Sequence, residues 1–247
     1  MTDKRIVRKA LAVAMPLVIV GPLLLTGCGS IHTAARRGDV KAVERRLALG
    51  ISPNSRHPLT VETPLIEAAS AGHLDVVKLL VERGADVNLK GEAWYTPLHC
   101  AAYYGHLDVA KFLLEHGADI TPFKAQGHNT ALHSAASGGH IEMAKLFVAR
   151  GVDINWKGVD EATALENAAG AGHVEMTRYL LANGADVNSR GIYGRTPLHA
   201  AAFRDKVETA RILLEHGADP ALECNGRPVS GPSEEFRQLL QQHASKR

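Results

Sequence analysis

Histidine is the residue type in this chain best suited to chemistry, with 13 copies in 247 residues. A zinc site would need three or four imidazole, thiolate or carboxylate groups that converge on one point. Most of these histidines instead recur at fixed places of a repeated phrase. They follow a Thr-Pro-Leu or Thr-Ala-Leu triplet, follow a glycine, or precede Gly-Ala-Asp: His99, His133 and His199; His73, His106, His140 and His173; His116 and His216. We therefore expect structural histidines, and we predict no bound metal and no cofactor.

Two other pairs of residues could take part in catalysis. His99-Cys100 places a base beside a thiol, but adjacent residues on a helix do not face each other. Other copies of the phrase fill the Cys100 position with serine, asparagine or alanine. Asp160-Glu161 could supply paired carboxylates for acid–base work, but the pair lies at a protruding loop tip that implies no pocket. We therefore predict no catalytic residues and no enzyme activity, with an enzyme or small-ligand receptor as the least favoured alternative.

The first 27 residues have the order of an export signal. Residues 1–9 are basic, and residues 10–25 form an apolar stretch of 16 residues. That stretch is shorter than the roughly 20 residues of a membrane-spanning helix. It ends in Leu25-Thr26-Gly27-Cys28, where small residues follow the apolar segment. A charged start, an apolar middle and a small-residue end predict a secretory signal.

Leu25-Thr26-Gly27-Cys28 resembles the lipobox of bacterial lipoproteins. The resemblance implies cleavage before Cys28 and attachment of lipid, palmitate included, at that residue. Gly29, by the same resemblance, implies an anchor in the outer membrane facing the periplasm. Residues 28–30 would form a short lipidated spacer, so an array starting at Ile31 would lie close to the membrane surface. The alternative interpretation is an ordinary signal anchor with a chance cysteine.

A repeated phrase organises the rest of the chain. Its Thr-x-Leu core begins at residues 63, 96, 130, 163 and 196, in steps of 33, 34, 33 and 33 residues. A Gly-Ala-Asp-like phrase keeps the same period from Gly84 to Gly217. Fixed periods of this length are the signature of stacked repeat units. Within each unit, threonine suits a helix N-cap, proline the first helical position and glycine the helix end.

These units resemble the ankyrin repeat, through Thr-Pro-Leu-His, Ala-Ala, Gly-His and Gly-Ala-Asp at the family's offsets. The resemblance implies a mainly α ankyrin-repeat solenoid of about six units, each two short helices and a hairpin-like loop. It also implies that His99, His133 and His199 hydrogen-bond the loops. We predict four segments: a signal peptide at 1–27, the spacer at 28–30, the array at 31–226 and a C-terminal capping segment at 227–247.

The charge of the predicted mature chain argues against a nucleic-acid partner. The full chain has a formal net charge of +2, with 28 Lys and Arg against 26 Asp and Glu. Without residues 1–27 the balance is 24 basic against 25 acidic residues. A phosphate-binding surface would need a clear basic excess. We also expect a monomer with no internal disulfide, because several units separate Cys100 from Cys224.

Partner-binding residues should be those that differ between copies at the loop tips and along the inner helices. Aromatic rings and arginine dominate the energetics of protein interfaces, and they gather at these variable positions. The predicted partner-binding residues are Trp94, Tyr95, Tyr103, Tyr104, Phe123, Trp156, Tyr193, Phe203 and Arg204. Trp94 is the most informative, because it stands where Gly194 stands in the best-matching copy.

These features together predict a membrane-anchored periplasmic module that binds a protein partner through its concave face. A more specific alternative is an immunity or inhibitor protein for a secreted antibacterial enzyme. We expect residues 158–190 to be the least stable unit, because Ala164 and Glu166 depart from the phrase. Gly170 adds a cost of about 1 kcal/mol relative to alanine inside a helix.

Overall fold

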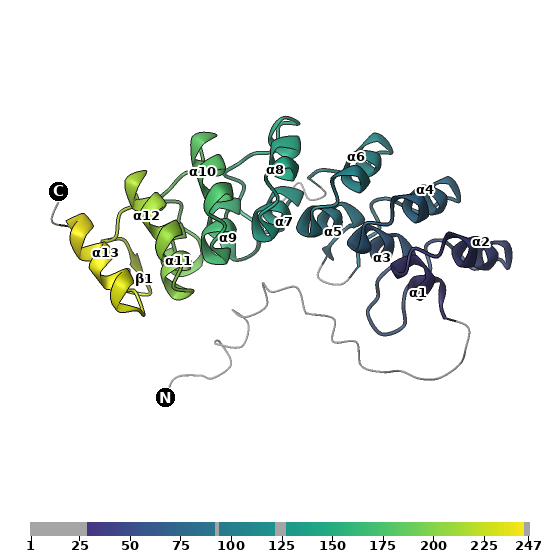
Figure 1. Cartoon of the computed structure of the whole chain (residues 1–247), viewed down its shortest axis with the longest axis horizontal. Coiled ribbons are helices and arrows are strands. Elements are labelled where there is room, and N and C mark those ends of the chain that lie inside the picture. The colour runs from purple at the N-terminus through teal and green to yellow at the C-terminus, as the bar shows by residue number, and fades with distance from the viewer. Residues whose placement is uncertain (1–28, 92–93, 122–126, 245–247) are drawn as a thin grey trace.

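The computed structural model describes residues 29–91, 94–121 and 127–244 as a curved row of helix pairs (Figure 1). Six inner helices line the concave side: α1 (Ile31–Arg36), α3 (Pro64–Ala71), α5 (Pro97–Tyr104), α7 (Ala131–Gly138), α9 (Ala164–Ala171) and α11 (Pro197–Phe203). Six outer helices form the convex row: α2 (Val40–Ala48), α4 (Leu74–Glu82), α6 (Leu107–Glu115), α8 (Ile141–Val148), α10 (Val174–Ala182) and α12 (Val207–Glu215). The predicted solenoid of six units is confirmed.

The phrase residues begin and end the inner helices as the sequence predicts. In the third unit, Thr96 is the N-cap of α5, Pro97 follows it, and His99 completes a capping box. Gly105 ends the helix with φ 79°, in the left-handed region that glycine adopts most easily. Close approach of a histidine ring also favours glycine at this position in the first four units. A Cβ atom on Gly72, for example, would lie 2.4 Å from the ring of His106.

One continuous hydrophobic core runs along the array from Ile31 to Leu239. The inner helices contribute small residues, so that Ala101 and Ala102 of α5 are fully buried against their neighbours. The outer helices contribute larger side chains such as Leu113. Helices of eight or nine residues are marginal alone, and burial between neighbouring units stabilises them. Among the described residues, no helix has the length and apolar character needed to cross a membrane.

Asparagine side chains tie successive loops together. Nδ2 of Asn88 donates to the carbonyl of Gly117 (3.0 Å), and its Oδ1 accepts from the amide of Asp119 (2.8 Å). The same pair of bonds recurs at three other asparagines: Asn54, Asn155 and Asn188. Thr121 occupies the equivalent position of the fourth unit. Its short hydroxyl lacks the amide that makes both bonds.

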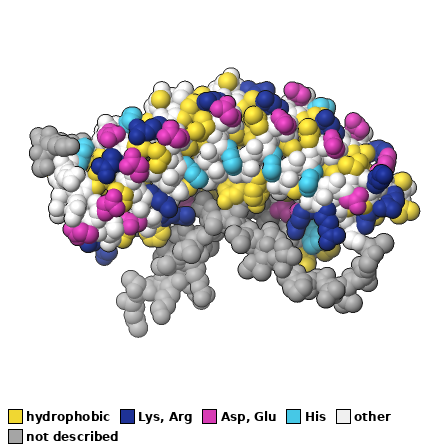
Figure 2. All heavy atoms as spheres, viewed as in Figure 1, with side chains coloured by type: hydrophobic (Ala, Val, Ile, Leu, Met, Phe, Trp, Pro, Cys, Tyr) yellow, Lys and Arg dark blue, Asp and Glu magenta, His cyan; other side chains and the backbone are white. Residues whose placement is uncertain are grey.

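Histidines tie successive inner helices together. His73, His106 and His173 each place Nε2 within 2.9–3.0 Å of a carbonyl near the end of the preceding inner helix. His140 bonds the carbonyl of Tyr103 in the same way, and burial lowers the pKa of its imidazole. Figure 2 shows histidine side chains spaced as a row across the visible face of the array. These residues are therefore structural, as the repeat position predicts.

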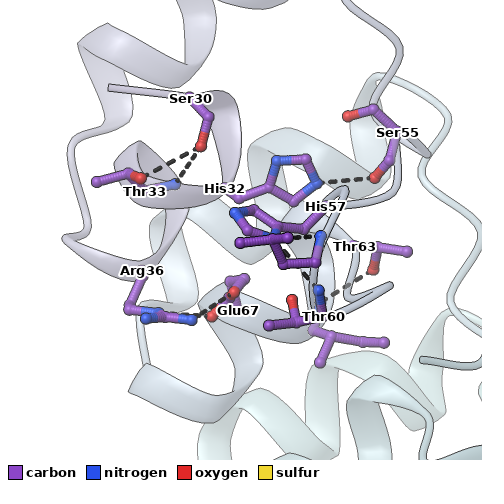
Figure 3. Close-up of polar contacts among 11 residues, drawn as sticks. Ser30, His32, Thr33, Arg36, Ser55, His57, Thr60, Thr63 and Glu67 are labelled. Carbon is purple, nitrogen blue, oxygen red and sulfur yellow. Dashed lines mark hydrogen bonds and ion pairs between the residues drawn. The ribbon is translucent and has the colours of Figure 1, made fainter. Parts of the chain in front are cut away.

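The first unit makes the same kinds of bond as the later units (Figure 3). Nε2 of His32 bonds the carbonyl of Ser55 (3.0 Å), and its ring meets that of His57 edge to face at 5.3 Å. Arg36 donates from Nε and Nη2 to the two oxygens of the buried Glu67 carboxylate, at 2.7 and 2.6 Å. Burial is the main cause that lowers the pKa of His32. The first two units are therefore joined by polar side chains as well as by the core.

A different set of residues closes the C-terminal end. Asp205 holds the left-handed position (φ 54°) that glycine holds in the preceding units. Its carboxylate accepts a 2.7 Å bond from Ser233, whose Oγ also accepts the amide of Phe236 in helix α13 (Glu234–Ala244). A two-stranded hairpin, β1 (Glu223–Cys224) and β2 (Arg227–Pro228), precedes this helix. The hairpin straddles the predicted boundary at 226.

Candidate partner-binding surface

The residue two positions before the cap threonine has left-handed backbone in four of the loops. The φ angles are 59° at Val61, 68° at Trp94, 56° at Glu161 and 79° at Gly194. Glycine adopts this conformation freely, whereas a bulky side chain costs about 1–2 kcal/mol there. Strained backbone of this kind is an established pointer to functional positions. Trp94 is the bulkiest side chain in the set.

The indole of Trp94 stands at the tip of its loop and remains 61% exposed. Lys90 Nζ lies 5.6 Å above the ring, and the ring of His128 meets it edge-on at 5.9 Å. A hollow of about 400 Å³ opens beside the indole, lined also by Arg56 and Asn88. The ring therefore presents an apolar face next to two cationic side chains, Lys90 and Arg56, and one carboxylate, Asp86. That combination suits a partner residue with an apolar body and an acceptor group.

Tyr103 and Tyr104 lie at the other end of helix α5, the helix that follows Trp94. Their rings meet edge to face at 5.1 Å, and Tyr104 also stacks on His106 at 6.3 Å. Tyr104 is 45% exposed and Tyr103 is half-buried. A helix of eight residues is about 12 Å long. The predicted centre therefore extends along α5, with Trp94 at one end and the tyrosine pair at the other.

Tyr95 and Trp156 lie between loops. Tyr95 is half-buried, packs edge-on against His99 at 5.7 Å, and hydrogen-bonds Asn129. Burial is the main cause that raises the pKa of its phenol. Trp156 donates its Nε1 proton to the carbonyl of His128 (3.0 Å). Both rings brace neighbouring loops, so their contribution to a partner surface would be indirect.

The remaining predicted residues lie toward the C-terminal end of the array or outside the described residues. Tyr193 is 59% exposed, with left-handed backbone at φ 58°, and Phe203 is 81% exposed at the end of α11. Arg204, the next residue, is also exposed. These three residues are exposed on the sixth unit, three units from Trp94. Phe123 and Cys28 fall outside the described residues.

Several exposed apolar residues at the loop tips were not among the predicted ones. Leu59 is 78% exposed, Val61 44%, Val159 42% and Ile192 37%. Leu59, Val159 and Ile192 each stand four residues before the cap threonine of their unit. This shared position is a sequence signal that could have found them. With Trp94 and Tyr193, they give most loops an apolar tip.

The residues considered for catalysis are arranged for structure. Nδ1 of His99 lies 2.8 Å from Oγ1 of Thr96, and its Nε2 lies 2.9 Å from the carbonyl of Asn129. His133 repeats both bonds, which confirms the expected loop contacts for His99 and His133. His199 keeps the 2.8 Å contact with Thr196, but within the described residues its Nε2 makes no hydrogen bond to the following loop. Burial raises the pKa of the Cys100 thiol to about 12, far from that of a reactive thiolate. Within the described ranges, no group of three or more His, Cys, Asp or Glu is placed to hold a metal.

Known proteins share this repeat and this architecture. A human ASB11 ankyrin repeat domain has a TM-score of 0.74 and 29% identity, over 87% of this chain and 97% of that one. "Probable E3 ubiquitin-protein ligase XBOS33" of Oryza sativa is 45% identical over 71 residues, which are 26% of this chain and 13% of the relative. "Ankyrin repeat-containing protein P1E11.10" of Schizosaccharomyces pombe is 41% identical over 63 residues, 26% of this chain and 30% of the relative. The chain thus spans less than a third of either curated relative.

The family assignment rests on a match along most of the array. The family model described as "Ankyrin repeats (3 copies)" matches residues 31–124 and 132–224. These ranges contain the helix pairs and the loops whose geometry is given above. Ankyrin repeats form a protein–protein interaction scaffold, in keeping with the exposed tips. The chain belongs to the ankyrin-repeat family.

Proposed function

We propose that the array binds a protein partner across its loop tips and inner helices, with Trp94 as the central contact. The observation that carries this proposal is the conformation of Trp94, which has φ 68° and an indole 61% exposed. Local folding would favour glycine at this position, as at Gly194. Contact with a partner gives the ring a role that compensates the strain. The array acts by binding and carries out no chemistry of its own.

The test is capture of partners from cell-envelope extracts with the wild-type chain and with Trp94→Gly. Proteins enriched by the wild type and lost with the variant are identified by mass spectrometry. Tyr179→Ala, an aromatic truncation on the outer helix α10, is the matched control and should retain the partner. Equal capture by wild type and Trp94→Gly would refute the role of Trp94. If the captured protein is a secreted enzyme whose activity falls on binding, the array is an inhibitor.

The proposal includes a lipid anchor at Cys28. Leu25-Thr26-Gly27-Cys28 supports it, together with the basic and apolar residues that precede this segment. Several acyl chains together give stable membrane binding, whereas one alone gives marginal binding. The resulting location is the periplasmic side of the outer membrane. Mass spectrometry of the mature N-terminus should find a lipid-modified Cys28, and an unmodified, uncleaved start would overturn the anchor.

A further inference from the structure

The first unit differs in charge from the rest of the array. Residues 31–50 contain five basic residues and two acidic ones. Residues 51–247 contain 19 basic and 23 acidic residues. The unit nearest the predicted lipid is therefore basic, while the remainder is acidic overall. Such asymmetry points to a charged partner for the basic part.

Both acidic residues of the first unit are used within the array. The carboxylate of Asp39 accepts the amide of Ala42 at 2.9 Å and caps helix α2. The carboxylate of Glu44 reaches across to Arg83 beside helix α4, at 3.3 Å. Both carboxylates remain exposed to solvent, but each is engaged in a contact within the array. The first unit therefore keeps a net charge of +3, from five basic residues against two acidic ones.

Three basic residues of the first unit remain exposed without a carboxylate partner in the described part of the chain. They are Arg37, Lys41 and Arg45. Arg36, by contrast, is bound to Glu67 through both of its bonds. Lys and Arg side chains gather over this end of the array in Figure 2. This end therefore carries accessible positive charge.

Helix geometry places two of these cations beside an exposed leucine. Lys41, Arg45 and Leu49 are spaced by four residues, so they form one stripe along α2. Leu49 is 81% exposed. Glu44 contacts Arg83 beside α4, and the stripe lies roughly 60° to 140° round the helix from Glu44, with Lys41 the nearest to it. Helix α2, which carries the stripe, stands at the end of the row in Figure 1.

The chain enters the array beside this same helix. Arg46 of α2 donates Nη2 to the carbonyl of Gly29 and Nη1 to that of Ala42. Gly29 is the residue that directly follows Cys28 in the sequence, and consecutive Cα atoms are about 3.8 Å apart. The described chain therefore begins beside α2, one residue after the predicted lipidation site.

We propose that Arg37, Lys41, Arg45 and Leu49, here called the end patch, bind the phosphate headgroups of anionic phospholipids. Lysine and arginine attract anionic headgroups, and an exposed leucine adds apolar contact at the interface. Acyl chains on Cys28 would hold the patch against the lipid, so the inference rests on the proposed anchor in this respect. The acidic remainder of the array is repelled by the same surface. The array therefore projects from the membrane, with Trp94 two units away from it.

The test uses residues 28–247 with Cys28→Ser, so that no lipid is attached; residues 31–239 contain the whole core. Sedimentation with vesicles at millimolar lipid compares phosphatidylglycerol-rich vesicles with pure phosphatidylcholine. We expect binding to the anionic vesicles alone, lost at high salt. Lys41→Gln with Arg45→Gln should weaken this binding by roughly thirtyfold. Lys111→Gln with Arg178→Gln removes the same charge from exposed sites on α6 and α10 and should leave it unchanged.

The outcomes separate the end patch from the anchor. Equal binding to both kinds of vesicle, or equal weakening by both double variants, overturns the patch even if mass spectrometry finds lipid on Cys28. Selective binding with an unmodified Cys28 keeps the patch and removes the anchor. Failure to bind anionic vesicles together with binding of an acidic protein at Lys41 and Arg45 also overturns the lipid assignment.

Discussion

The guanidinium of Arg195 bonds the carboxylate of Glu166, which is only 2% exposed, from the loop of the next unit. Glu166 stands where other units carry a histidine that bonds the following loop. Burial raises the pKa of this carboxyl, while Arg195 opposes the shift. The ion pair thus links its unit to the following loop, as His99 and His133 do in their units through imidazole hydrogen bonds.

Removal of Arg195 should destabilise the array most at neutral pH. Arg195→Leu leaves a buried carboxylate unpaired, at a cost of about 3 kcal/mol. A carboxyl with a raised folded-state pKa contributes stability that is lost as pH rises through that pKa, so the cost should shrink on acidification. Urea unfolding at about pH 8 and about pH 5 measures the difference. Addition of Glu166→Gln should restore most of the loss, and a cost unchanged with pH would contradict this account.

Two glycines should respond in opposite directions to alanine. A Cβ atom on Gly170 of α9 would meet Ala200 at an ordinary 3.5 Å, so Gly170→Ala should stabilise by about 1 kcal/mol. A Cβ atom on Gly138 of α7 would lie 2.1 Å from the carbonyl of Tyr103, so Gly138→Ala should destabilise. Chemical unfolding measures both. Hydrogen exchange should show residues 158–190 opening early in the wild type and later in Gly170→Ala; uniform protection would refute the weak unit.

Trp94 should be dispensable for folding. Trp94→Gly relieves the left-handed strain at φ 68° and should keep or raise the midpoint of thermal unfolding. Trp94→Ala retains a Cβ atom in the same backbone and should be the less stable of the two. Leu98→Ala, at a fully buried position of α5, should lose about 2–5 kcal/mol. A loss of similar size in Trp94→Gly would make the indole a packing residue.

A fifth asparagine could add the hydrogen bonds between successive loops that the fourth unit lacks. Thr121→Asn supplies the amide that Asn88 uses one unit earlier, aimed at the carbonyl of Gly151 and the amide of Asp153. Two added hydrogen bonds should raise the free energy of unfolding by about 1 kcal/mol. Asn88→Thr should lower it by a similar amount. Thr121→Val is the control, because it keeps the shape and offers no polar group; a gain in that variant would assign the effect to packing.

Acid should unfold the array through its buried histidines. Burial lowers the pKa of His99 and His133 from 6.5 to about 4. The folded chain therefore binds these protons more weakly than the unfolded chain, and stability is lost as pH falls from 6.5 toward 4. Each imidazole contributes roughly 3 kcal/mol over that range. His133→Gln should flatten this pH dependence, measured by urea unfolding at about pH 7 and about pH 5.

The repeat phrase predicted most of the fold because its residues act locally. Thr96, Pro97 and Gly105 fix the start and the end of α5 by capping and backbone conformation, and the period supplies the stacking. The junctions were harder to predict, since Arg195 finds Glu166 only after two units have been placed side by side. Asp205 is a further example. It stands where the preceding units carry glycine, and its carboxylate accepts a hydrogen bond from Ser233, 28 residues later.

The candidate surface was predicted in part for the same reason. A residue that departs from the phrase is free of the repeat's own contacts, which identified Trp94, Tyr193 and Phe203 as exposed. A difference from the repeat phrase could not by itself distinguish a ring exposed to solvent from a ring packed against a neighbouring loop. Tyr95 and Trp156 are also variable loop residues, yet Tyr95 packs against His99 and Trp156 donates to the carbonyl of His128. Side-chain direction at a loop tip depends on the neighbouring loop, which a single copy of the phrase does not contain.

The asparagine ties have a consequence for how such a chain can evolve. Each tie joins a residue of one unit to two backbone groups of the next, and Asn54, Asn88, Asn155 and Asn188 use the same groups each time. An internal unit that is duplicated or deleted leaves the ties on either side complete. The two ends lack this freedom, because Arg46 is committed to Gly29 and Asp205 to Ser233. Selection can therefore change the length of the middle, and with it the set of exposed tips, while both ends are inherited intact.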